Sequence, residues 1–225
     1  MRDTLFEADY FDEFIAEELA RIERFQTRLN SGTVKEDRVP AIKDKLLSIR
    51  LGVLIAKYSR GDSLNDLKKE FELIIMDLTD TWCADSYYEN LRIASLAVLF
   101  NVNSEMKKLV KNVLEASEMR DCLIDFLICD DTGIDRSEGL KFPKIYDSLK
   151  SSIMNGSAED IKIYMKSWYS KHKDCSWYDS HKSKEHLYYG YWSFEAAAVA
   201  KRISIDDTGF DNIQYYPYDL AHFDL

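Results

Sequence analysis

The stretch HLYYGYWSFEAAAVAKRISIDDTGFDNIQYYPYDL, residues 186–220, does most to decide the fold. Its middle part favours a helix, and between Gly190 and Ile203 only Glu195 carries a charge before Lys201. A helix that is apolar on nearly every side belongs in a protein core. The segment that follows should be extended, because a residue before proline is pushed out of the helical region. We therefore expect a buried helix over residues 190–203, with the C-terminus locked onto it. The structural residues of this lock are Trp192, Glu195, Tyr216 and Pro217.

The composition predicts an all-α protein. The 225 residues include only 8 glycines and 3 prolines, so the chain has few turns and long elements. We expect a compact bundle of roughly ten helices without a significant sheet. The natural division is an N-terminal helical region, 1–116, and a C-terminal helical region, 117–225, packed on it as one compact unit.

The first predicted helix runs from about Thr4 to Leu29. Thr4 and Glu7 have the spacing of a capping box, in which each side chain satisfies a backbone donor of the first turn. At 100° per residue the apolar side chains share one face. Glu7 and Glu18 fall within that face, and aspartates and glutamates lie opposite.

Cysteine usage and the N-terminus point to the cytoplasm. The spacing of Cys83, Cys122, Cys129 and Cys175 matches no metal or redox motif, so reduced core thiols are expected. The first twenty residues are acidic, unlike a secretion signal, and no uncharged run is long enough to span a membrane. We expect no cofactor and no bound metal.

The negative charge is concentrated in three blocks. Residues 1–20 and 70–89 each have a balance of −6, and residues 206–225 have −5, within a chain of net charge −10. Such a chain should repel nucleic acid and attract a basic partner, although solubility alone would also explain the acids. The candidate partner-binding residues are Asp77, Asp80, Asp85 and Glu89 around the turn between the third and fourth helices, and Asp9, Asp12, Glu13 and Glu17 on the first. We favour the former group, because residues 70–89 contain no base.

Signals for an enzyme are weak. His181 and His186 are five residues apart, which places them 140° apart on a helix and does not match a zinc-binding motif. A carboxylate such as Glu195 on a buried helix can mark an active site, but a structural hydrogen bond explains it equally well. The aromatic residues at 168–169, 177–178 and 192 are better explained by packing between helices than by base stacking.

Four stretches resemble the PoNi family of bacterial immunity proteins, which neutralise PoNe-type DNase toxins of polymorphic toxin systems. The C-terminal stretch combines GYWSFEAAAVAKR, IDD and YYPYDL. The others are RDTLFEADYFDEFIAEELARIERF at 2–25, KYSRGDSLNDLKKEF at 57–71 and WYDSHK at 177–182. The resemblance implies a cytoplasmic, non-catalytic protein whose partner is a cognate nuclease toxin, in a setting such as type VI secretion.

The leading hypothesis is therefore an immunity protein that binds a basic DNase through an acidic helical surface, without contacting nucleic acid or a membrane. The first alternative is a helical adaptor or scaffold with an unrelated partner. The second is a helical hydrolase centred on Glu195 or on the segment from His181 to His186. A monomer and a homodimer are both compatible with the sequence.

Overall fold

The computed structural model describes residues 1–81, 86–129 and 139–223, except for the side chains of 79–81. The described residues form α-helices and two short 3-10 helices and contain no strand, so the predicted all-α fold is confirmed. None of the described helices is long and apolar enough to cross a membrane. The α-helices are α1 (Ala8–Asn30), α2 (Val39–Arg60), α3 (Leu64–Thr81), α4 (Tyr87–Leu99), α5 (Ser104–Glu115), α6 (Cys122–Ile128), α7 (Pro143–Asn155), α8 (Ala158–Lys171), α9 (Phe194–Arg202) and α10 (Tyr218–Ala221).

The chain divides into two compact units, and neither is continuous in sequence. The first contains residues 1–83 and 179–190, and the second contains residues 84–178 and 191–225. These limits come from the packing of the backbone. The division after residue 116 that we expected from the sequence remains a proposal.

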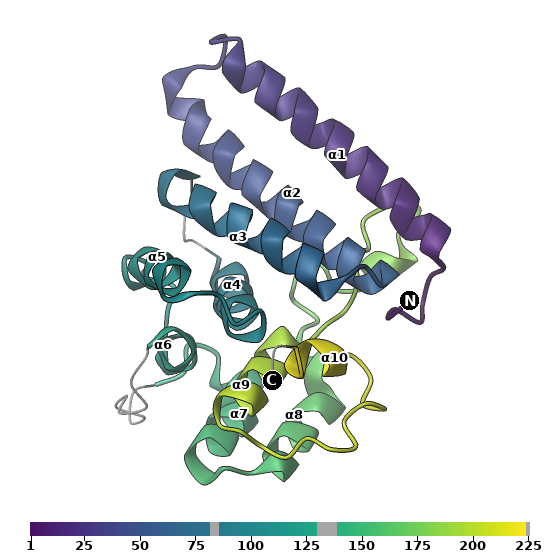
Figure 1. Cartoon of the computed structure of the whole chain (residues 1–225), viewed down its shortest axis with the longest axis vertical. Helices are drawn as coiled ribbons and strands as arrows, with labels where there is room; N and C mark the ends of the chain where they lie inside the picture. The colour runs from purple at the N-terminus through teal and green to yellow at the C-terminus, as the bar shows by residue number, and fades with distance from the viewer. Residues whose placement is uncertain (82–85, 130–138, 224–225) are drawn as a thin grey trace. The chain divides into compact units, whose positions relative to one another are not determined.

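The first unit is built around α2. Helices α1 and α3 pack on α2, which lies between them in Figure 1. The second half of α2 is almost completely buried, as expected of a helix with neighbours on two sides. It ends at Gly61, which adopts a left-handed conformation with φ of 107° and lies against the backbone of Met1. A side chain at this position would be strained and would meet that backbone.

The predicted start of the first helix was wrong. Helix α1 begins at Ala8, and Glu7 is its N-cap residue without a side-chain capping bond. The residues before it turn instead around Asp3, whose Oδ1 accepts hydrogen bonds from the backbone N–H groups of Leu5 and Phe6. The capping box does not form because Asp3 also accepts a hydrogen bond from the hydroxyl of Tyr188, far along the chain, and this contact favours the turn around Asp3.

Residues 179–190 close the first unit against the helices. The backbone N–H of Tyr188 donates to the hydroxyl of Tyr10 at 3.1 Å, and the carbonyl of Tyr189 accepts from Ser59 Oγ at 2.8 Å. The ring of Tyr189 lies 6.3 Å from that of Phe14, measured between centroids. The segment 179–190 therefore contacts both α1 and α2 and links these two helices.

The second unit is centred on α4 and α9, which pack against each other. Ser86 caps α4, and most residues of α4 are buried. Helix α9 is also almost fully buried, but it begins at Phe194 and not at Gly190. The reason for the shorter helix is visible in the backbone, because the N–H of Ser193 donates to the carbonyl of Tyr215 at 2.8 Å. That bond links Ser193, just before the helix, to the C-terminal segment.

The C-terminal segment is attached to α9 by both apolar and polar contacts. Tyr216 and Pro217 are buried, and α10 packs on α9 with Leu220 fully buried. The Tyr216 hydroxyl donates to Asp207 Oδ2 at 2.7 Å. Lys201 Nζ donates to the carbonyls of Leu99 and Phe223 at 2.9 and 2.5 Å. The end of the described chain is therefore a packed part of the second unit.

Candidate functional site

The outer face of α1 carries a row of acidic side chains. Asp9, Asp12, Glu13 and Glu17 are all exposed, and Asp9, Glu13 and Glu17 follow one another at intervals of four residues. Residues with this spacing lie on one side of a helix. The opposite side is buried through Phe11, Phe14, Ile15 and Ile22. We call Asp9, Asp12, Glu13 and Glu17 the α1 acidic face.

Two neighbouring groups position part of this face. Arg60 Nη1 contacts Asp12 Oδ1 at 2.5 Å, and the same guanidinium pairs with Asp62 at 2.6 Å. Hydrogen bonds to Asp62 and Asp12 raise the pKa of Arg60 against the opposing effect of burial. His186 lies 3.3 Å from Glu17 and 3.6 Å from Glu13, contacts that are ion pairs only when the imidazole is protonated. Four acids against one permanent cation leave the face negative at neutral pH.

An apolar spot continues the same face. Leu19 is 48% exposed, and the adjacent Ala16 and Ala20 are exposed as well. Ala16 lies three residues before Leu19 and four after Asp12, so the apolar spot adjoins the acids along the helix. Protein interfaces combine an apolar centre with a polar rim. The sequence carried a signal for Leu19, because it is a leucine that falls outside the apolar stripe of the helix.

The second acidic group is not brought together by the described structure. Asp77 on α3 is exposed and bonded to Arg50, and it belongs to the first unit. Glu89 is half-buried in the first turn of α4, in the second unit. Asp85 and the side chain of Asp80 lie outside the described residues. The role expected for this group remains a prediction.

Glu195, the carboxylate of the C-terminal signature, is a hydrogen-bond acceptor in the second unit. Its Oε1 accepts from Tyr164 Oη at 2.6 Å, Trp168 Nε1 at 2.6 Å and Ser193 Oγ at 2.7 Å. The three donors are buried, whereas Glu195 itself is half-buried. Burial and the nearby Glu195 charge raise the pKa of Tyr164 well above its ordinary value. This arrangement indicates a structural role, because the engaged oxygen already satisfies three donors that would otherwise be left in the core.

Trp192 was expected among the structural residues of the C-terminal lock. It is half-buried and precedes α9, because the backbone at 193 is bonded to Tyr215 and not to a preceding helical turn. The central aromatic of the second unit is Trp168, whose ring stacks on that of Trp177 at 5.2 Å. These rings pack on one another, as the core interpretation of the aromatic residues anticipated.

The remaining candidate residues for catalysis or metal binding are a buried histidine and the cysteines. Buried His172 contacts the carbonyl of Trp168 through Nδ1 at 2.6 Å and the Tyr146 hydroxyl through Nε2 at 3.2 Å. Burial lowers the pKa of His172. No group of three or more metal-ligating side chains occurs within the described ranges. Cys122, Cys129 and Cys175 are free thiols, and Cys83 lies outside the described residues.

Two family models cover the chain almost from end to end. The N-terminal model of the PoNe immunity protein (PoNi) matches residues 2–111, and the C-terminal model of the PoNe immunity proteins matches residues 119–220. No curated protein and no solved structure gives a significant match. The two matches follow one another along the chain, with the N-terminal model before the C-terminal model. The chain therefore belongs to the PoNi family of PoNe immunity proteins.

Proposed function

We propose that this protein neutralises a PoNe-type DNase toxin by binding it directly, with the α1 acidic face at the interface. Family membership makes the protein an immunity protein for PoNe nuclease toxins. The observation that supports this surface is the row Asp9, Glu13 and Glu17, exposed along one side of a helix whose other side is anchored in the core. In this proposal the protein acts in the cytoplasm, where an incoming DNase would reach the chromosome.

Electrostatics explains why an acidic helix suits this partner. A DNase needs cationic side chains to hold the phosphates of its substrate. An acidic face complements such a groove, accelerates encounter and occupies the surface that DNA would use. The apolar spot at Leu19 would then provide the contact that is shielded from water, since charges at the rim contribute mainly to the rate of association.

In view of the structure, we rank the α1 acidic face above the other acidic group as the candidate binding surface. We favoured the acids around α3 from the sequence, because residues 70–89 contain no base. In the folded protein Asp77 has Arg50 as a partner and Asp12 has Arg60, so the absence of bases in residues 70–89 no longer distinguishes the two groups. We place the α1 acidic face first because three of its acids follow one another along the exposed side of one helix. The α1 acidic face has the better support, and the other group serves as a parallel test.

Binding kinetics with the cognate toxin test this proposal. The variant Asp9→Lys/Glu13→Lys should slow association about tenfold at low salt and reduce its salt dependence, with the helical content unchanged. The matched control is Glu118→Lys/Asp147→Lys, which makes the same change in net charge at two exposed acids of the second unit. Equal slowing in both variants would show that net charge, and not the α1 acidic face, controls association.

A third variant, Asp80→Lys/Asp85→Lys, tests the group that the sequence favoured. If only this variant slows association, the interface lies around the end of α3 and the start of α4. If the complex forms with unchanged rates in all three variants, the acidic interface is elsewhere, and direct binding itself is contradicted only if purified toxin and immunity protein do not associate.

A further inference from the structure

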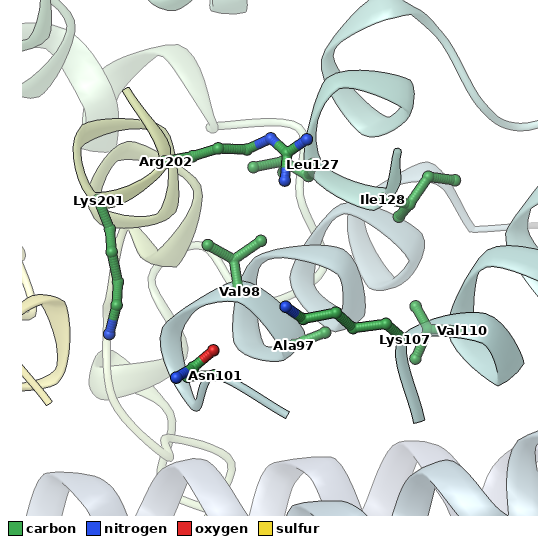
Figure 2. Close-up of a pocket in the computed structure, with 9 residues that line it drawn as sticks. All are labelled: Ala97, Val98, Asn101, Lys107, Val110, Leu127, Ile128, Lys201 and Arg202. Carbon is green, nitrogen blue, oxygen red and sulfur yellow. The ribbon is translucent and has the colours of Figure 1, made fainter. Parts of the chain in front are cut away.

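Two pockets of the second unit differ in what they can hold. The smaller one, shown in Figure 2, encloses about 180 Å³ among α4, α5, α6 and α9. Lys201 and Arg202 on its wall donate to backbone carbonyls, so these side chains serve the packing of the unit. The larger one encloses about 570 Å³ between α8 and the segment 209–215. That volume lies within the range of about 300–1,000 Å³ that is usual for ligand sites. We call the larger pocket the α8 groove.

One wall of the α8 groove is a single stripe along α8. Its members follow the first one at intervals of three, four, seven and eight residues, which places them on one side of the helix. They are Lys162, Met165, Lys166, Tyr169 and Ser170. At about 1.5 Å per residue, the stripe extends over roughly 12 Å. An extended peptide spans this length with roughly four residues, because a strand rises by about 3.3 Å per residue.

The opposite wall is held in place before any ligand binds. Tyr215 has a φ of 69°, a left-handed conformation that is rare for a bulky side chain. Its carbonyl accepts a hydrogen bond from the N–H of Ser193 at 2.8 Å. Its ring lies 5.3 Å from the ring of Trp168 and stacks on that of Tyr169 at 5.6 Å. A wall fixed in this way costs little ordering entropy when a ligand arrives.

Two lysines, one helical turn apart, bring positive charge to the groove. The ammonium of Lys162 lies 5.5 Å from the ring centroid of Phe210 and 3.9 Å from a carboxylate oxygen of Glu159. An ion pair this long and this exposed contributes little, so a carboxylate of a ligand can replace it. Lys166 is exposed. Side chains four residues apart on a helix begin about 5–6 Å apart, and alternate side chains of an extended peptide are about 6.6 Å apart. The lysine spacing therefore matches acidic residues at alternate positions.

The aromatic end of the groove suits an apolar side chain better than a nucleobase. Tyr169 stacks on Tyr178 at 4.5 Å as well as on Tyr215, so its faces are engaged within the protein. Stacking of a base requires an accessible aromatic face. An apolar side chain can instead pack against the ring edges and against Ile213, which is half-buried in the opposite wall.

We propose that the α8 groove binds an extended acidic segment of a protein partner. Two carboxylates at alternate positions contact Lys162 and Lys166, and an apolar side chain two residues beyond them packs at the end formed by Tyr169 and Tyr215. The length of the stripe, the spacing of the cations and the engaged aromatic faces select this occupant together. The proposal is independent of toxin binding through the α1 acidic face, which belongs to the first unit and has the opposite charge.

Titration of the full-length protein with capped pentapeptides tests the proposal without any toxin. The probes are DADAF and its reverse FADAD, since the segment can run in either direction along the groove. Amide shifts in ¹H–¹⁵N NMR spectra should saturate for at least one of them with a Kd of about 1 mM or below, centred on α8 and residues 209–215. The neutral peptide NANAF and the respaced peptide DDAAF should bind at least about threefold more weakly.

Paired lysine variants separate the groove from the general charge of the protein. Lys162→Gln/Lys166→Gln should weaken binding of the better probe at least about fivefold. Lys171→Gln/Lys173→Gln removes the same charge at two exposed lysines outside the groove and should leave binding unchanged. The proposal is overturned if neither probe gives a saturable shift, if NANAF or DDAAF binds as tightly, or if the two variants behave alike. Tighter binding of deoxyadenosine monophosphate at the same residues would also overturn it, in favour of a nucleotide site.

Discussion

Replacing Glu195 with alanine should lower the free energy of unfolding by about 3–5 kcal/mol, because it removes the common acceptor of three buried donors. Those donors are the hydroxyl of Tyr164, the indole N–H of Trp168 and the hydroxyl of Ser193, at 2.6, 2.6 and 2.7 Å from Oε1. The three side chains are 0, 3 and 0% exposed. They are therefore poorly placed to recover these bonds from bulk solvent.

The magnitude follows from the number and setting of the bonds. A buried donor left without an acceptor costs about 1–3 kcal/mol, which would give up to about 9 kcal/mol for three. Glu195 is half-buried, so water entering the vacated space should satisfy part of this set and bring the total to the lower part of that range. Glu195→Gln keeps an oxygen acceptor but loses the charge, and charged acceptors form bonds about twice as strong as neutral ones. We therefore expect a loss of about 1–3 kcal/mol for glutamine.

Equilibrium unfolding in urea, followed by circular dichroism, measures these differences through the shift in midpoint at constant slope. Glu159→Ala is the control, since Glu159 lies on the exposed side of α8 and makes only a 3.9 Å ion pair with Lys162. It should change stability by less than about 0.5 kcal/mol. A loss below 1 kcal/mol for Glu195→Ala, or equal losses for alanine and glutamine, would refute the structural role assigned to this carboxylate.

Truncation after Phe210 removes buried Tyr216 and Leu220, and it should lower Tm by roughly 10 °C or more; equal thermal melts of the truncated and full-length chains would contradict the attachment of this segment. Trp192→Ala should cost about 1–3 kcal/mol in urea unfolding, less than a fully buried tryptophan, because the side chain is half-buried. Burial lowers the pKa of His172 in the folded protein, so the unfolded chain binds the proton more readily and stability should fall as pH decreases below about 6.5. Urea unfolding at pH 7.5 and 5.5 should show a smaller difference in His172→Gln than in the unchanged protein.

Elements that are governed by local interactions carry local signals in the sequence. Ser86 and Ser157 cap α4 and α8 through bonds to the backbone three residues on, and Pro143 opens α7 in the first turn. These positions depend on residues close in sequence, which is why capping and proline patterns locate them. The exposure of the α1 acids likewise follows from the periodicity of a single helix.

Contacts between residues far apart in the sequence determine the features that could not be predicted. The start of α1 depends on Asp3, which engages Tyr188, and the start of α9 depends on Ser193, which engages Tyr215. One pocket of the second unit is lined by residues from α4, α5, α6 and α9, so no single stretch of sequence carries its pattern. The three partners of Glu195 come from two segments, and the sequence did not show that their side chains meet at this carboxylate.

The discontinuity of the first unit bears directly on how the α1 acidic face is held. Residues 1–83 contain all three of its long helices, but Tyr188 and Tyr189 supply contacts to Tyr10, Phe14 and Ser59 that these helices do not make among themselves. His186, from the same segment, lies beside Glu13 and Glu17. A binding surface gains affinity when its side chains are already ordered before the partner arrives. The segment 179–190 therefore does more than connect two stretches of the second unit. It helps to order the α1 acidic face that we propose for toxin binding, which gives a physical reason for combining α1 with a segment far away in the sequence.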